Sequence, residues 1–284
     1  MRIARIATDA DADFAVHDGQ RGWIPLKSAG IEATDTPSMV ERVDEIARAL
    51  VASSDGVIAD ESSLQAPIVR PSKMIAIGLN YIDHIKETKA EQPERPVVFA
   101  KFPNAIVGPF APVLMDPGLT EMGDYEVELA VVIGRRTRGV SEDEALKAVF
   151  GYTVANDVSA RDWQFKDPQF DRSKGFDTFC PIGPWITTAD EVPDPQALTI
   201  RSWVNGQPRQ DSSTQLMLFS VAELIAFLSR GMTLEPGDVI LTGTPHGVGF
   251  AMDPPQYLQP GDHVECEVES LGKIRNPIVG PGAG

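Results

Sequence analysis

The segment DYEVELAVVIG, residues 124–134, brings two carboxylates into the start of an apolar run. Side chains two residues apart in a strand point to the same face, so Glu126 and Glu128 share one face and Tyr125 and Val127 share the other. Two neighbouring buried carboxylates repel each other and lose hydration, a cost that a bound divalent cation would remove. The alternative is an edge strand with one face in water.

Asp157 ends a second apolar run, YTVAND, at residues 152–157. A turn or a helix cap before Ser159–Asp162 is the alternative interpretation of this carboxylate. Two strands that each deliver acids favour a joint site made of two glutamates and one aspartate. Three carboxylates with water in the remaining positions suit Mg²⁺ or Mn²⁺ better than Zn²⁺, which prefers His and Cys.

A histidine and a glutamate lie three residues apart in GLNYIDHIKE, residues 78–87, which follows a strand-like run. Asn80 could cap a short helix here, and on that helix His84 and Glu87 would be neighbours. A carboxylate beside an imidazole orients the ring and raises its basicity, as a general base acting on water requires. The alternative is a surface helix with an incidental pair.

Arg161, Gln164 and Lys174 follow Asp157 closely in the sequence. Basic groups near a carboxylate cluster could pair with it or hold an anionic substrate, and ordinary surface charge is the alternative.

The loop TGTPHGVG, residues 242–249, follows another strand-like run. Its glycines would let backbone N–H groups approach an oxyanion or a carboxylate closely, and a merely tight loop is the alternative. His246 could be a catalyst or a hydrogen-bonding loop residue. His17 and His263 are expected to be structural or exposed.

The balance of charge excludes several classes of partner. The 284 residues include 41 acidic and 25 basic side chains, a formal net charge of −16. Such a surface repels phosphate backbones and anionic lipids, which argues against nucleic acid and membrane partners. The two cysteines, Cys180 and Cys266, form no CxxC motif and suit a reducing cytosol. The start lacks the apolar run of a signal peptide, and no stretch approaches about 18 apolar residues, so a cytoplasmic protein is expected.

Residues 1–70 are predicted to form a small N-terminal α+β domain. It would contain a helix over residues 39–51, capped by Ser38 with Glu41 and ended by Ser53–Gly56. Its strand-like runs are residues 2–7, 13–18 and 21–26.

Residues 71–284 are predicted to form a second, mostly β domain. Capping boxes at Ser141 and Ser220 predict two helices, and Asn205-Gly206 predicts a hairpin turn. The strands do not alternate regularly with helices, so the pattern favours a large, mixed, curled α+β architecture that is mostly β over a doubly wound sheet. The expected strands are residues 73–79, 96–102, 125–134, 151–159, 198–204, 238–243 and 263–270.

Taken in order, six segments resemble the fumarylacetoacetate hydrolase family, in particular its subgroup of acylpyruvases and 2,4-diketo-3-deoxy sugar acid hydrolases. The segments are residues 77–87, 99–109, 124–134, 151–164, 174–185 and 232–249. The resemblance implies a mixed β-roll catalytic domain behind a variable small N-terminal domain. It also implies a homodimer and Mg²⁺ or Mn²⁺ at the site.

The same resemblance implies roles for individual residues. Carried over position by position, the metal ligands are Glu126, Glu128 and Asp157; the catalytic residues are His84, Glu87 and Lys174; and the substrate-binding residues are Arg161, Gln164 and Thr244. The stretch from Asp157 to Lys174 is shorter than in the fumarylacetoacetate-cleaving enzymes and lacks their tyrosine, which argues against fumarylacetoacetate as the substrate.

The leading hypothesis is metal-dependent hydrolysis of a C–C bond in a 2,4-diketo acid. The substrate would be an acylpyruvate, or a 2,4-diketo-3-deoxy-L-rhamnonate or fuconate type of acid, cleaved to pyruvate and a carboxylic acid. His84, oriented by Glu87, would deprotonate water, and Lys174 would stabilise the oxyanion or help to protonate the enolate. The alternatives are an oxaloacetate decarboxylase and a 2-hydroxyhepta-2,4-diene-1,7-dioate isomerase. A metal-stabilised binding protein is a third class, which the His84–Glu87 pair disfavours.

Overall fold

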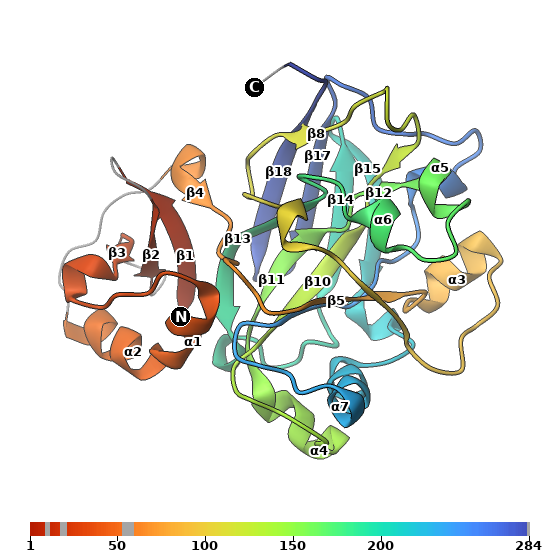
Figure 1. Ribbon diagram of the computed structural model, residues 1–284. Helices are drawn as coiled ribbons and strands as arrows, with labels where there is room; N and C mark the ends of the chain where they lie inside the picture. Colours follow the sequence, from red (N-terminus) through yellow and green to blue (C-terminus); the bar gives the residue numbers. More distant parts are fainter. Residues whose placement is uncertain (9–11, 18–21, 53–59, 283–284) are drawn as a thin grey trace.

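The computed structural model describes residues 1–8, 12–17, 22–52 and 60–282 (Figure 1). The α-helices are α1 Thr36–Glu41, α2 Val43–Ala52, α3 Ile82–Thr88, α4 Glu142–Ala145, α5 Arg161–Gln164, α6 Asp171–Lys174 and α7 Val221–Gly231. The 3₁₀ helices are η1 Lys27–Ala29, η2 Glu61–Ser63, η3 Pro103–Ala105, η4 Leu146–Ala148, η5 Ala189–Glu191, η6 Thr214–Leu216 and η7 Gly249–Ala251. The strands are β1 Arg2–Ala7, β2 Ala12–His17, β3 Ile24–Pro25, β4 Leu64–Gln65, β5 Met74–Gly78, β6 Val97–Ala100, β7 Ile106–Val107, β8 Val113–Leu114, β9 Gly123–Asp124, β10 Val127–Ile133, β11 Val149–Asn156, β12 Ser159–Ala160, β13 Cys180–Thr188, β14 Thr199–Val204, β15 Gln207–Ser213, β16 Val239–Leu241, β17 His263–Val268 and β18 Gly272–Val279.

The largest sheet runs in the order β3-β2-β1-β13-β11-β10-β16-β5-β6. Strands β16 and β5 are parallel, whereas β10 is antiparallel to both of its neighbours. Every residue of β10 and β11 is buried, as expected for continuous apolar runs with covered faces. Strand β10 is therefore a central strand, and the alternative of a half-wet edge strand is wrong.

A second sheet, β15-β14-β17-β18-β8, packs against the first. Its strands β14 and β17 contact β10, and β18 contacts β11 and β13. Figure 1 shows the blue strands β17 and β18 beside β10 and β11, with α3, α5 and α6 on the right of the view and α4 beside α7 below. The expected α+β, mostly β class is confirmed by this mixed architecture.

Strand β1 of the N-terminal region pairs with β13 of the main sheet, through Arg2↔Thr187 and Ile3↔Ile186. The N-terminal strands thus extend the main sheet at one edge. The division into residues 1–70 and 71–284 stays a prediction.

Several predicted helix starts differ in the structure. Asp35, not Ser38, caps the first helix, because its side chain accepts the Ser38 N–H and Pro37 occupies the first turn, where proline is favoured. The predicted helix over residues 39–51 is two helices that meet at Arg42. Its predicted end at Ser53–Gly56 lies outside the described residues.

The two capping boxes of the second region have different outcomes. Ser220 and Glu223 form the predicted reciprocal box at the start of α7. Ser141 precedes α4 but its side chain makes no capping bond, and only its backbone oxygen accepts the Glu144 N–H, at 3.2 Å. The four-residue length of α4 gives this cap little helix to stabilise.

The hairpin signal is confirmed, and two long strands were missed. Asn205 and Gly206 both have positive φ, 53° and 75°, and join β14 to β15. Strand β13 carries Pro181 and Pro184, residues that argue against a central strand, and it was therefore not predicted. Strand β18, which follows the β17 run after a short turn, was missed as well. Within the described residues, no helix is long and apolar enough to span a bilayer.

Candidate active site

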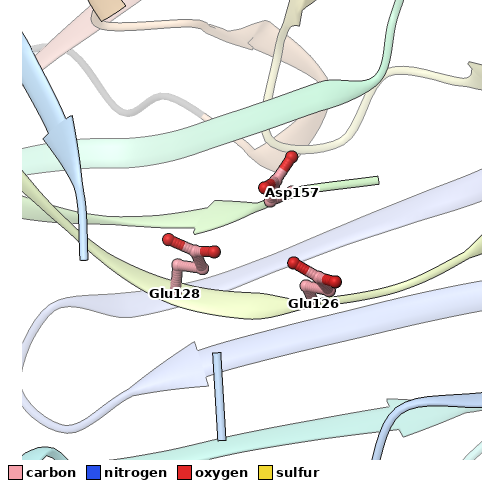
Figure 2. Close-up of side chains that lie close together, drawn as sticks. All are labelled: Glu126, Glu128 and Asp157. Carbon is pink, nitrogen blue, oxygen red and sulfur yellow. The ribbon is translucent and has the colours of Figure 1, made fainter. Parts of the chain in front are cut away.

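Two adjacent strands bring three carboxylates together. Glu126 directly precedes β10, Glu128 lies in it, and Asp157 directly follows β11, whose register pairs Val127 with Asn156. One carboxylate oxygen of each acid lies within 4.8 Å of those of the other two, and all three residues are buried (Figure 2). The strand periodicity that places Glu126 and Glu128 on one face thus delivers both toward Asp157.

Glu128 is the acid without a close cation. Its side chain accepts the Gly243 N–H at 2.7 Å, and within the described residues it forms no ion pair. Burial raises the pKa of Glu128 well above its ordinary value, and the negative charges of Asp157 and Glu126 raise it further. A divalent cation would offset this repulsion, and an all-carboxylate set of oxygen donors fits Mg²⁺ or Mn²⁺.

Two buried lysines face the other two acids. The Lys174 Nζ lies 2.8 Å from Glu126 Oε2 and 2.7 Å from Asp157 Oδ2, and it also donates to Ser159 Oγ at 2.8 Å. The Lys101 Nζ lies 2.6 Å from Asp157 Oδ1. Burial would raise the pKa of Glu126, but the charges of Lys174 and Arg161 outweigh this effect and hold it at about 2.

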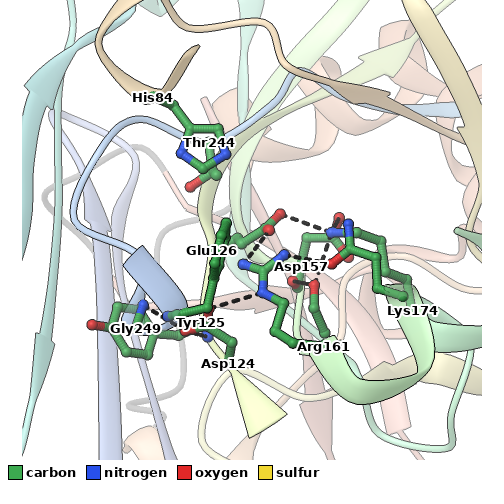
Figure 3. A network of polar contacts seen from close by, with 12 residues as sticks. His84, Asp124, Tyr125, Glu126, Asp157, Arg161, Lys174, Thr244 and Gly249 are labelled. Carbon is green, nitrogen blue, oxygen red and sulfur yellow. Dashed lines mark hydrogen bonds and ion pairs between the residues drawn. The ribbon is translucent and has the colours of Figure 1, made fainter. Parts of the chain in front are cut away.

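Arg161 connects the acids to a neighbouring loop (Figure 3). Its Nε donates to Asp124 Oδ2 at 2.9 Å, and its Nη2 lies 2.6 Å from Glu126 Oε1. Its Nη1 donates to Gln164 Oε1 at 2.7 Å. The Asp124 carboxylate also accepts the Gly249 N–H at 2.8 Å. Arg161 is therefore fixed by two acids rather than exposed, so the surface-charge alternative is wrong for it.

The predicted dyad is close in space. His84 lies on α3, and its Nδ1 is 3.3 Å from Glu87 Oε2. The other Glu87 oxygen accepts the Gly247 N–H at 2.8 Å, which holds the carboxylate in place. His84 is buried and lines the same cavity as Glu126.

The helix that carries the dyad does not begin as expected. Tyr81, not Asn80, is the N-cap of α3, and it makes no side-chain cap. The Asn80 amide instead donates to Thr242 O and Phe219 O, and its oxygen accepts the Phe219 N–H. Asn80 is fully buried, so its amide satisfies these backbone groups rather than the helix end.

The loop after β16 holds Thr244 and His246. The Thr244 hydroxyl donates to Val127 O at 2.9 Å and accepts from Gln210 Nε2 at 2.8 Å, so its proton is committed to the fold. His246 Nδ1 lies 2.9 Å from Asp83 Oδ2. His246 is absent from the cavity lining, and its contact is that of a hydrogen-bonding loop residue.

Six of the predicted site residues line one cavity of about 260 Å³, namely His84, Glu126, Arg161, Gln164, Lys174 and Thr244. The remaining three, Glu87, Glu128 and Asp157, lie directly behind them through the contacts above. This geometry can hold a divalent cation beside an imidazole that moves protons.

Comparisons with known proteins place the chain in a family of enzymes. The family model described as "Fumarylacetoacetate (FAA) hydrolase C-terminal" matches residues 73–279. The chain belongs to the fumarylacetoacetate hydrolase family. It is 44% identical to a bovine protein named oxaloacetate tautomerase FAHD2A, mitochondrial, over 95% of this chain and 88% of that protein.

Two solved structures of the family are similar over the whole chain. The fumarylacetoacetate hydrolase from the psychrophile Exiguobacterium antarcticum superposes with a TM-score of 0.87 at 39% identity, covering 99% of both chains. A maleylpyruvate hydrolase from Sphingobium sp. SYK-6, in complex with manganese (II) ion and pyruvate, superposes with a TM-score of 0.79 at 30% identity, again over 99% of both chains.

The site of this fumarylacetoacetate hydrolase family member contains residues that the sequence analysis did not single out. Lys101 is 2% exposed and pairs with Asp157, and Asp124 is fully buried and holds Arg161. Lys101 lies in the resembling segment 99–109, at the end of the apolar run VVFA. A lysine directly after an apolar run was the available signal. Asp124 opens DYEVE, and its position two residues before Glu126 was the available signal for a third acid on that face.

Proposed function

We propose that the protein is a Mg²⁺- or Mn²⁺-dependent oxaloacetate tautomerase, which interconverts the keto and enol forms of this 2-oxo acid. The observation that carries the proposal is the His84–Glu87 pair opening onto the same cavity as the buried acids. The relatives named oxaloacetate tautomerase support proton transfer over the C–C hydrolysis that the sequence analysis ranked first.

Glu126, Glu128 and Asp157 would hold the metal ion. Their oxygen donor set supports this assignment, as does the manganese in the Sphingobium maleylpyruvate hydrolase. When bound, the ion would act as a Lewis acid that stabilises the negative charge of an enolate. Gly243 keeps Glu128 oriented through its N–H, and Lys101 does the same for Asp157.

His84 would move the proton. In one direction its imidazole takes a proton from C3 of the keto form, and the electron pair of that C–H bond forms the C2=C3 double bond while the C2 carbonyl becomes an enolate oxygen. The imidazolium then returns the proton to that oxygen, so that no carbon–carbon bond is broken. Glu87 orients the imidazole through Nδ1 and is itself fixed by the Gly247 N–H. Glu87 is therefore proposed as a positioning residue.

Lys174 and Arg161 would act mainly through their charge. The three N–H bonds of the Lys174 ammonium already face Glu126, Asp157 and Ser159, which leaves no free donor for a substrate oxygen. Within the described residues, the Gln164 side-chain nitrogen donates no hydrogen bond, so it is the donor proposed to hold the substrate carboxylate. Thr244 would contribute its backbone N–H, because its hydroxyl proton is already donated to Val127 O.

The test follows enol oxaloacetate by its ultraviolet absorbance, with manganese-loaded full-length protein. We expect metal-dependent conversion to the keto form without pyruvate. His84→Asn should lower kcat on the order of 10²–10⁴-fold. The matched control is His263→Asn, an exposed residue of β17 outside the cavity lining, which should retain kcat. Equal conversion with and without chelator, or full turnover by His84→Asn, would refute the proposal.

C–C hydrolysis of 2,4-dioxo acids is the second candidate. The same dyad could activate water, and the Sphingobium neighbour is a maleylpyruvate hydrolase. Oxaloacetate decarboxylation is a further alternative, which needs no attacking water. Pyruvate formed from a 2,4-dioxo acid without CO₂ would identify the hydrolase, and pyruvate formed from oxaloacetate with CO₂ would identify the decarboxylase.

We also propose that residues 1–70 form a small N-terminal domain, that the protein is a cytoplasmic homodimer, and that its substrate is a small anionic 2-oxo acid. The buried free thiols of Cys180 and Cys266 support a reducing compartment. The exposed apolar side chains of Phe102, Leu114 and Leu119 offer surface for a second copy. Light scattering of the purified protein tests the dimer.

A further inference from the structure

Four phenylalanines line the cavity that Glu126 also lines. Phe99 and Phe170 meet edge to face, with ring centroids 5.5 Å apart. Phe165 and Phe250 meet in the same way at 5.6 Å. Ile77, Leu79 and Ala90 add further apolar lining. Much of the cavity lining is therefore aromatic and aliphatic surface.

The positive charges that line the cavity are paired with acids of the chain. Among the described lining residues the basic side chains are His84, Arg161 and Lys174. Each already faces a carboxylate of the chain: Glu87 for His84, and Glu126 for both Arg161 and Lys174. The inner rings of the walls stack near these cations, with the Arg161 Cζ 4.5 Å from the Phe250 ring centroid and the Lys174 Nζ 5.3 Å from that of Phe99.

This distribution of apolar side chains and paired charges disfavours the binding of a dicarboxylate. The head of a 2-oxo acid would lie beside Glu126 and His84, so its distal end would extend among the phenyl rings that make up much of the remaining lining. A carboxylate there would lose hydration without gaining a cationic partner, which is costly. An apolar group there would gain from burial and from edge-to-face contacts with the rings.

We infer that the site takes 2-oxo acids with an apolar, aryl or branched-alkyl substituent beyond C3, more tightly than dicarboxylates such as oxaloacetate, and that Phe170 and Phe165 determine this preference. The inference rests on the proposed function for the orientation of the 2-oxo head. The same proton transfer at C3 would apply to these acids, because it involves only the common 2-oxo carboxylate and its neighbouring carbon.

The test compares three acids that share the 2-oxo head and lack a 4-oxo group, so that none is a 2,4-dioxo acid open to hydrolytic cleavage. They are 2-oxobutanoate, 2-oxoglutarate and 2-oxo-4-phenylbutanoate, which place hydrogen, carboxylate or phenyl on C4. Isothermal titration of manganese-loaded full-length protein measures each Kd. The phenyl acid should bind tighter than 2-oxobutanoate on the order of tenfold or more, because even one methylene is worth about tenfold in an apolar pocket. 2-Oxoglutarate should bind no tighter than 2-oxobutanoate.

Two variants locate the preference. Phe170→Ala removes half of one wall and should weaken binding of the phenyl acid more than binding of 2-oxobutanoate. Phe165, which is 60% exposed at the rim, tolerates a charge, and Phe165→Lys should tighten 2-oxoglutarate binding and weaken phenyl binding. Leu146→Ala is the control, since Leu146 is an apolar side chain that is 42% exposed and outside the cavity lining.

The outcomes separate this inference from the proposed function. If 2-oxoglutarate binds the unmodified protein as tightly as the phenyl acid, or if Phe170→Ala weakens all three acids equally, the inference is wrong even where oxaloacetate is tautomerised. If the phenyl preference is found but enol oxaloacetate is not converted, the inference holds and the tautomerase proposal fails. Absence of binding by all three acids overturns the inference alone, because the proposed function is decided by the conversion of enol oxaloacetate.

Discussion

The three clustered acids differ in how their charge is balanced. Glu126 faces Arg161 and Lys174, and Asp157 faces Lys101 and Lys174, whereas Glu128 has only a backbone donor. The local excess of negative charge therefore resides at Glu128 when its carboxyl is ionised, a form that its raised pKa shifts to higher pH. Neutralising it should relieve repulsion in the metal-free protein and remove a metal ligand at the same time.

Glu128→Gln should thus raise metal-free stability and abolish the effect of metal. We expect Tm without metal to rise by about 2–4 °C, for a relief on the order of 1 kcal/mol. Manganese affinity should fall by more than the roughly 10–100-fold that follows loss of an outer-shell partner. Thermal scans with chelator and titration with Mn²⁺ measure the two effects. Glu121→Gln, an exposed acid, is the control, and unchanged manganese affinity in Glu128→Gln would contradict the assignment.

Lys101→Met should have the opposite effect on the metal-free protein. It leaves Asp157 with one of its two lysines in a fully buried setting, and breaking a buried pair costs about 3–5 kcal/mol. Urea unfolding with chelator measures the loss. Lys147→Met is matched in chemistry but breaks an exposed pair with Glu144, whose attraction is screened by water, so a much smaller loss is expected. Equal losses in both variants would show that Lys101 is not balancing a buried charge.

A site residue could be predicted from the sequence when its partner lies close to it along the chain. Glu126 and Glu128 were predictable because the two-residue period of a strand needs no tertiary knowledge. Lys101 and Asp157 are 56 residues apart, and Arg161 and Asp124 are 37 apart. These pairs depend on which strands become neighbours, which local patterns do not specify.

At the scale of elements, the loop from Thr242 to Phe250 is held by the acids of the site. The N–H groups of Gly243, Gly247 and Gly249 donate to Glu128, Glu87 and Asp124 respectively. Glycine is required at Gly247, where φ is +99° and a Cβ would lie 2.1 Å from Arg209 O. The glycine pattern suggested close backbone approach, and the structure identifies side-chain carboxylates as the partners.

Gly247→Ala should therefore lower both stability and turnover. The methyl group would push the loop away from Arg209 and withdraw the N–H that fixes Glu87, so kcat should fall as His84 loses its orientation. Gly261→Ala is the control: its φ of +103° carries the same backbone strain, but no atom lies within 4 Å of the added Cβ. Urea unfolding and enol oxaloacetate conversion are measured for both. If the two variants lose stability equally and keep kcat, the loop does not position the dyad.

Local sequence signals predicted an element correctly when its defining contacts are made within a few residues. They failed when the element depends on the strands that become its neighbours in the sheet. The Ser220–Glu223 box and the Asn205-Gly206 turn formed as predicted, since both are satisfied within a few residues. Strand β13 is not among the expected strands. Its prolines argue against a central strand, and its pairing with β11 and β7 cannot be read from the local sequence.

At the scale of the whole molecule, metal binding should add to folding stability. The three acids lie within or directly beside β10 and β11, two strands whose residues are all buried, and unfolding separates the two strands. An ion that binds only the folded state contributes about 2.7 kcal/mol when present at 100 times its Kd.

We therefore expect Tm to rise with Mn²⁺ concentration and to return to its starting value on chelation. Differential scanning fluorimetry of the full chain measures this dependence, and Glu128→Gln should show no rise. A Tm independent of Mn²⁺ in the unmodified protein would contradict a metal site in the core of the fold.

Asp124, Glu126 and Glu128 occupy alternate positions of one five-residue stretch, and this has a consequence for insertions and deletions. Substitution at one of these positions alters one contact. One extra residue between Glu126 and Val127 would leave Glu126 in place, but every following side chain of the strand would point to the opposite face. Glu128 would then point into the hydrophobic core. The number of residues in this stretch therefore matters more than the identity of any one of them, because an insertion or deletion here would break up the cluster of acids.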